Sequence, residues 1–175
     1  MRKASLSKIP PQRPSRRRFI AAGCSTLSTS LVAELVPSIA IAAAAPTNPY
    51  PRIDIVSIDA LKEEVPIAFN YPDASSPALL VQLRESAAGG VGPDKRIVAF
   101  SRLCTHKGCP VAYRPERKLF ICPCHWSSFD PAKAGQMVIG QGSEPLPQIA
   151  LELNGKTVQA VGVSGLIFGR ETNIL

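Results

Sequence analysis

Short apolar runs separated by turn residues dominate the chain after residue 50. Residues 78–83, 96–100 and 118–121 are such runs, and each is too short to be a helix of several turns. The segment between the first two, residues 88–94, reads A-G-G-V-G-P-D and consists mostly of turn-forming residues. This pattern predicts short strands joined by tight loops.

A β-hairpin is predicted near the C-terminal end. Residues 149–153 and 157–161 are strand-like runs on either side of Asn154-Gly155, a dipeptide that favours a two-residue hairpin turn. Residues 59–64 are expected to form a single helical turn, and no long segment shows the helical period. We therefore expect an all-β protein built from antiparallel sheets.

The charge of the chain is concentrated at its N-terminus. The 175 residues predict one principal domain, with a formal net charge of +7. Residues 1–44 hold seven basic residues and one acidic residue, which leaves 13 of the 20 basic and 12 of the 13 acidic residues for the remainder. Because the remainder is nearly neutral, its charge gives no reason to expect a nucleic-acid partner.

The basic excess belongs to a targeting segment. Residues 15–20, S-R-R-R-F-I, resemble the twin-arginine export motif, and a moderately apolar stretch follows up to small residues at 40–44. We interpret residues 1–44 as a twin-arginine signal peptide and residues 45–175 as the mature domain. This interpretation predicts a periplasmic protein.

Two other fates of the N-terminal segment stay open at this stage. It could be retained as a membrane anchor, although Glu34 and Pro37 are unfavourable in a span of about 20 apolar residues. Cys24, which follows Ala22-Gly23, could mark a lipoprotein, although the apolar run before it is short. A membrane contact is therefore expected only if the segment is not cleaved.

Two boxes hold four of the five cysteines and both histidines of the chain. They are residues 104–109, C-T-H-K-G-C, and residues 122–127, C-P-C-H-W-S. Two cysteines and two histidines could bind zinc, but zinc fingers use C-x2-4-C and H-x3-5-H pairs, whereas each box here mixes the two residue types. Two plain disulfides would leave the placement of both histidines unexplained.

The boxes resemble the Rieske pattern C-T-H-x-G-C followed by C-P-C-H-x-S. This resemblance implies a [2Fe–2S] cluster in which two cysteines bind one iron and two histidines bind the other. The implied metal ligands are Cys104, His106, Cys122 and His125. Such a cluster exchanges one electron, so we expect electron transfer and no substrate chemistry on this chain.

The same resemblance assigns roles to neighbouring residues. Cys109 and Cys124 are implied to form a disulfide between the loops, which would persist in an oxidising compartment after export. Ser127 is implied to donate a hydrogen bond to a cluster sulfur. Phe129 stands where respiratory Rieske proteins have a tyrosine that reaches a ligand thiolate, so we expect a lower reduction potential here.

The resemblance also implies an architecture. A Rieske domain has a base of stacked sheets and an inserted cluster-binding subdomain, which we place at roughly residues 102–147. The base is then formed by residues 50–101 and 148–175. Lys107 and Trp126 flank the histidines, and the sequence leaves open whether they shape a docking surface, are solvated or are packed.

Segments outside the boxes resemble the small subunit of arsenite oxidases. They are residues 109–113, 129–133, 140–142, 146–148 and 165–175. This resemblance implies a large molybdopterin subunit as partner and a soluble cytochrome c or azurin-like protein as electron acceptor. The alternatives are the Rieske subunit of a membrane-bound cytochrome bc-type quinol oxidase complex and a dioxygenase ferredoxin, which would be cytosolic and lack the two extra cysteines.

Overall fold

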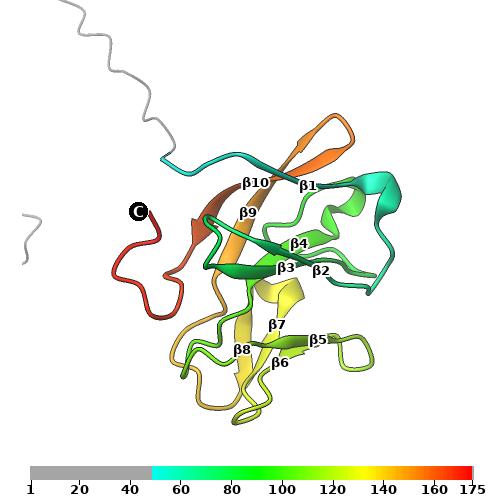
Figure 1. The fold of residues 1–175 in the computed structure, drawn as a ribbon. Helices are drawn as coiled ribbons and strands as arrows, with labels where there is room; N and C mark the ends of the chain where they lie inside the picture. The colour runs from blue at the N-terminus through cyan, green and yellow to red at the C-terminus, as the bar shows by residue number, and fades with distance from the viewer. Residues whose placement is uncertain (1–48, 175) are drawn as a thin grey trace, which may run out of the picture. The chain divides into compact units, whose positions relative to one another are not determined.

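The computed structural model of the protein describes residues 49–174, which form two antiparallel sheets (Figure 1). The larger sheet has the strand order β1-β10-β9-β4-β3-β2. Its strands are β1 (Ile53–Ser57), β2 (Ile67–Asn70), β3 (Pro77–Gln82), β4 (Ile97–Ser101), β9 (Gln148–Asn154) and β10 (Thr157–Ser164).

The smaller sheet is inserted in the chain between β4 and β9 and has the order β5-β6-β7-β8. Its strands are β5 (Ala112–Arg114), β6 (Leu119–Ile121), β7 (Ser128–Asp130) and β8 (Gln136–Ile139). Helical structure within residues 49–174 is limited to the single 3-10 turns Ile58–Ala60, Pro93–Lys95 and Pro131–Lys133. The predicted all-β fold with an inserted subdomain is confirmed.

Strands β3 and β4 are buried on both faces because they separate two cores. Side chains alternate along a strand, so Val81 and Phe100 pack on one side, and Leu80 and Ala99 pack on the other. This explains why the sequence shows continuous apolar runs at these positions and no apolar-polar alternation.

Aromatic rings fill the space between the two sheets. Phe120 of β6 contacts Phe100 of β4 edge to face, with ring centroids 5.5 Å apart, and Tyr113 of β5 at 5.3 Å. Cys104 and Cys122 belong to the same buried cluster of side chains. The core that joins the sheets therefore extends to the cysteines of both boxes.

Two local predictions need correction. The hairpin turn is Gly155-Lys156, one residue later than predicted, because Asn154 still pairs with Thr157 and Gly155 supplies the positive φ of +57°. The helical turn is Ile58–Ala60, so it covers only the start of the predicted 59–64 segment.

The predicted signal peptide, residues 1–44 with Cys24, lies outside the described residues. Among residues 49–174, no helix has both the length and the apolar character that a bilayer crossing requires.

Candidate metal centre

The first box forms a tight loop between β4 and β5. The backbone N–H of Cys104 donates to the carbonyl oxygen of Cys109 at 3.0 Å, and the N–H of Gly108 donates back to the carbonyl oxygen of Cys104 at 2.8 Å. Leu103 and Pro110 form an isolated bridge just outside these bonds. Both backbone polar groups of Cys104 thus hold the two ends of the loop together.

The second box, between β6 and β7, repeats this backbone pattern. The N–H of Cys122 donates to the carbonyl oxygen of Ser127 at 2.9 Å, and the N–H of Trp126 donates to the carbonyl oxygen of Cys122 at 3.0 Å. Trp126 has φ +61° and Gly108, at the same place in the first loop, has φ +71°. The two boxes thus present their residues from two loops of equivalent conformation.

The first cysteine of each loop is a buried free thiol. Cys104 and Cys122 are each 1 % exposed. Burial raises the pKa of Cys104 above its ordinary value, the neighbouring Cys122 thiol raises it further, and the backbone N–H groups of His106 and Lys107 oppose the shift. Both thiols are held out of water, and backbone amides are directed at one of the two sulfurs. This environment fits a site where a metal replaces the thiol protons.

The two histidines lie together at the outer side of this site. The ring centroids of His106 and His125 are 4.8 Å apart, and the ring planes meet at 76°. His106 is half-buried and His125 is exposed. The sulfur donors therefore face the core and the nitrogen donors face solvent, an arrangement that fits a centre with chemically different metal ends.

Cys109 and Cys124 form the predicted disulfide and link the two loops, with an S–S distance of 2.05 Å and Cα atoms 6.5 Å apart. The Sγ atoms of Cys109, Cys122 and Cys124 all lie within 4.8 Å of one another. Since Cys109 and Cys124 are bonded to each other, they offer no free thiolate. The free thiols of the two boxes are those of Cys104 and Cys122, and their role as metal ligands remains a prediction.

A third loop, residues 140–147, covers the site. Its Gln141 N–H donates to the Ser127 hydroxyl at 3.0 Å, and Thr105 donates its hydroxyl to the carbonyl oxygen of Glu144 at 2.8 Å. A Cβ added at Gly142 would lie 2.9 Å from Thr105 Oγ1 and 3.2 Å from Phe129 Cε1. Sequence reasoning missed Thr105 as a link to this loop, and the only sequence signal was the pair of glycines in G-Q-G.

The neighbours singled out in the sequence occupy distinct environments. Ser127 is fully buried, and its hydroxyl oxygen accepts the Gln141 amide, which leaves its own proton to be donated. Phe129 is fully buried in the core cluster that contains Cys104. The roles of Ser127 and Phe129 toward a cluster remain predictions.

Lys107 and Trp126 are both exposed, and Trp126 has 69 % of its surface accessible. Trp126 lines a surface hollow of about 440 Å³ together with His125, Arg117 and Ile139. A packed interior role for Trp126 is therefore excluded.

Comparisons with known proteins agree with this geometry. The Rieske [2Fe-2S] domain family matches residues 54–150. The chain is 40 % identical over 158 residues to the iodate reductase subunit IdrB of Pseudomonas sp. (strain SCT), covering 89 % of this chain and 82 % of that protein. It is 39 % identical over 163 residues to IdrB of Denitromonas iodatirespirans, covering 91 % of this chain and 86 % of that protein.

Two further similarities are more limited. The Rieske subunit of the Streptomyces lividans cytochrome bc1 complex is 41 % identical over 59 residues, 33 % of this chain and 35 % of that protein. The soluble domain of Rieske protein II (soxF) from Sulfolobus acidocaldarius has the same fold, with a TM-score of 0.62 at 23 % identity over 70 % of this chain and 82 % of that one. The chain thus belongs to the Rieske [2Fe–2S] family, carries a Rieske-type cluster and acts in electron transfer.

Proposed function

We propose that this chain is the Rieske small subunit of a periplasmic arsenite oxidase. In this role it takes electrons from a large molybdopterin subunit and passes them to a soluble cytochrome c or azurin-like protein. Arsenite and water yield arsenate, protons and two electrons on the large subunit, and the [2Fe–2S] cluster carries these electrons one at a time.

The observation that carries this proposal is where the arsenite oxidase-like segments lie. Two of those outside the boxes lie against the same site. Residues 140–142 cover Ser127 and Phe129, and the segment 165–170 places Phe168 against Gly108. The resemblance therefore includes the surroundings of the cluster as well as its ligands.

The residues of the chain supply what a carrier needs. The free thiols of Cys104 and Cys122 are buried, so the sulfur ligands are protected from water and oxidants. The exposed His125 offers a short path out of the protein, and the hollow beside Trp126 gives a partner an apolar contact next to that path.

Iodate reductase is the second candidate, because the IdrB similarity extends over 89 % of the chain at 40 % identity. In that case electrons would pass from this chain to the large subunit, where iodate is reduced. A one-electron carrier works in either direction, so the residues of the site are compatible with both reactions. The cytochrome bc1 similarity covers only 33 % of the chain. It therefore supports a quinol-linked role less strongly than the IdrB similarity supports iodate reduction.

The proposed location is the periplasm, reached by twin-arginine export. The motif at residues 15–20 supports this location. The Cys109–Cys124 disulfide supports it as well, since such bonds persist in oxidising compartments. Release of the native protein by osmotic shock is expected, whereas a need for detergent would favour a retained anchor.

The proposal is tested on the complex purified from the native host through a tag on this chain. We expect a large subunit to copurify with molybdenum and iron, and we expect arsenite to reduce the Rieske cluster and added cytochrome c. A complex that ignores arsenite but oxidises a reduced donor with iodate would replace this proposal with the second candidate. A chain that copurifies with cytochrome b would support the quinol-linked alternative.

A further inference from the structure

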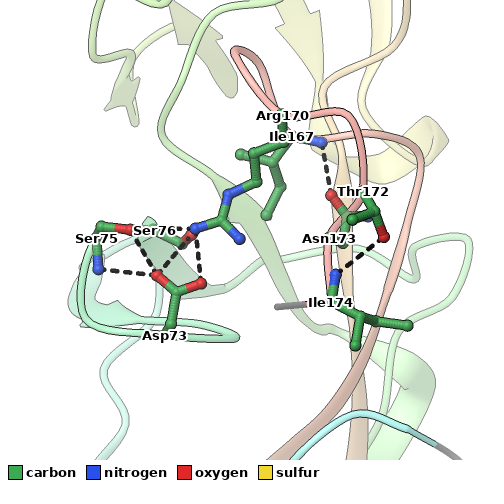
Figure 2. Close-up of polar contacts among 8 residues, drawn as sticks. All are labelled: Asp73, Ser75, Ser76, Ile167, Arg170, Thr172, Asn173 and Ile174. Atoms are coloured by element: carbon green, nitrogen blue, oxygen red, sulfur yellow. Dashed lines mark hydrogen bonds and ion pairs between the residues drawn. The ribbon is translucent and has the colours of Figure 1, made fainter.

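The C-terminal segment folds back on itself in a closed loop, residues 165–174, which we call the C-terminal clasp. The side chain of Asn173 closes it. Its Oδ1 accepts the N–H of Ile167 at 2.9 Å (Figure 2). Its Nδ2 donates to the carbonyl oxygen of Gly165 at 2.7 Å. Asn173 is 8 % exposed and Ile167 is 1 % exposed. The clasp is therefore an ordered element although it contains no helix or strand.

A partly buried ion pair anchors the clasp to the larger sheet. Arg170 Nη2 lies 2.6 Å from Asp73 Oδ2 and 3.1 Å from Ser75 Oγ. Asp73 lies in the connection between β2 and β3, where its Oδ1 accepts the N–H and the hydroxyl of Ser75 and the hydroxyl of Ser76 (Figure 2). The clasp is thus tied to a hydrogen-bonded turn of the base.

The clasp places the ring of Phe168 directly on the first cluster loop. A Cβ added at Gly108 would lie 2.6 Å from Cδ1 and 2.8 Å from Cε1 of Phe168. Real side chains do not approach so closely, so Phe168 occupies the space that any side chain at position 108 would need. Phe168 keeps 38 % of its surface exposed, so it lies on the loop from outside.

The second cluster loop shows why this contact matters. Trp126 has the same left-handed backbone conformation as Gly108 and makes the equivalent hydrogen bond, yet it carries a large side chain. The loop conformation by itself therefore strains a side chain at this place without excluding one. At position 108 the close approach of Phe168 is a second obstacle to any side chain.

We propose that Phe168 is a positioning residue for the cluster: it clamps the first loop at Gly108 and thereby fixes His106 and limits water around it. This inference rests on the family assignment and on the chain itself. It does not depend on which large subunit or substrate the proposed function names.

The test uses the cluster-loaded protein without partner or substrate, as wild type and as the variants Phe168→Ala and Phe168→Leu. Leu153→Ala is the matched control, because Leu153 is 39 % exposed and lies in the β9–β10 hairpin. Backbone amide exchange is measured by mass spectrometry for residues 104–110 and 122–127, and the reduction potential is measured by protein-film voltammetry.

We expect Phe168→Ala to accelerate exchange in residues 104–110 by about tenfold, with residues 122–127 unchanged. We also expect its potential to rise, because water admitted near His106 stabilises the added negative charge of the reduced state. Phe168→Leu should retain most of the wild-type behaviour. The proposal is overturned if exchange in the first loop changes no more than in Leu153→Ala.

A double-mutant cycle gives an independent test of the clamp. Gly108→Ala should accelerate exchange strongly when Phe168 is present and much less in the Phe168→Ala background, where only the backbone strain remains. Equal effects of Gly108→Ala in both backgrounds would show that the two residues are not coupled, which would also overturn the proposal.

Discussion

Tyr113 donates a hydrogen bond to Glu64 Oε2 across 2.7 Å and so joins the smaller sheet to the base inside the protein. The second carboxylate oxygen accepts the N–H of Arg84 at 3.1 Å, and Glu64 is 7 % exposed. Burial, followed by the hydrogen bond and the charge of Glu64, raises the pKa of Tyr113 above its ordinary value. The hydrogen bond therefore stabilises the attachment of β5 to the base as long as Tyr113 is protonated.

Removing this hydroxyl in Tyr113→Phe is expected to destabilise the protein by about 1–3 kcal/mol, because the buried carboxylate loses a donor. Since the pKa of Tyr113 is raised in the folded state, the stability that its hydroxyl contributes is complete below about pH 10 and is lost as pH rises above that value. Thermal unfolding from pH 7 to 11 measures this. An alkaline decline that is identical in wild type and Tyr113→Phe would contradict the assignment.

The carboxylate of Asp73, which anchors the C-terminal clasp, is expected to stabilise the fold in a way that is lost in acid. Hydrogen bonds from Ser75, then from Arg170, lower its pKa to about 2. Because the pKa is lowered, the stabilisation is present above the unfolded-state value of about 4 and is lost as pH falls toward 2. We expect Asp73→Asn to lower the free energy of unfolding by about 1 kcal/mol or less, because the ion pair is partly exposed. Its unfolding temperature should therefore lie below that of wild type. The difference between the two proteins should be constant above pH 4 and shrink below it; a difference independent of pH would count against this reading.

Ser127→Ala is expected to lower the reduction potential by roughly 60 mV, the value for about 1.4 kcal/mol of lost preference for the reduced state in a one-electron couple. The reason is the loss of a hydroxyl proton that would be donated toward a cluster sulfur. Ser128→Ala is the control, because Ser128 is also buried but donates its hydroxyl to the carbonyl oxygen of Trp126 at 3.1 Å. Equal potentials for Ser127→Ala and wild type in film voltammetry would remove Ser127 from the residues that tune the cluster.

Phe129→Tyr is expected to raise the potential, because a hydroxyl that donates to a ligand thiolate favours the reduced state. Phe129 lies next to Gly142, whose added Cβ would be 3.2 Å from its ring, so the new hydroxyl must fit a tightly packed site. Film voltammetry and a crystal structure of the variant together test this. An unchanged or lower potential, with the hydroxyl seen at the sulfur, would refute the assigned role.

The disulfide is expected to matter more for retaining the cluster than for the fold. A bridge spanning 15 residues would contribute roughly 3 kcal/mol in isolation, but the cluster already connects the same two loops. The double variant Cys109→Ala with Cys124→Ala should therefore lose its cluster faster to a chelator, followed by absorbance. Its cluster-loaded form should keep the wild-type circular dichroism, and global unfolding of that form would disprove the argument.

Much of the fold was readable from the apolar runs alone. The predicted runs at 78–83, 96–100 and 118–121 became β3, β4 and β6, since a buried strand needs apolar residues on both faces. Strands β1, β2, β5, β7 and β8 were not predicted. None of them carries a continuous apolar run like those of β3 and β4, so these segments form because neighbouring strands pair with them rather than through their own pattern.

The sequence by itself determined the chemistry of this protein, because thiolate and imidazole donors at those spacings are compatible with few metal centres. Only the tertiary structure decided which distant residues surround the site. It brought Thr105 to Glu144 and Phe168 to Gly108, across 39 and 60 positions of the chain. Such contacts leave no periodic trace in a sequence, since they depend on where the sheets bring distant loops together. For the same reason Gly108 could be read from the sequence only as part of the first box, whereas the structure shows that an aromatic ring rests on it.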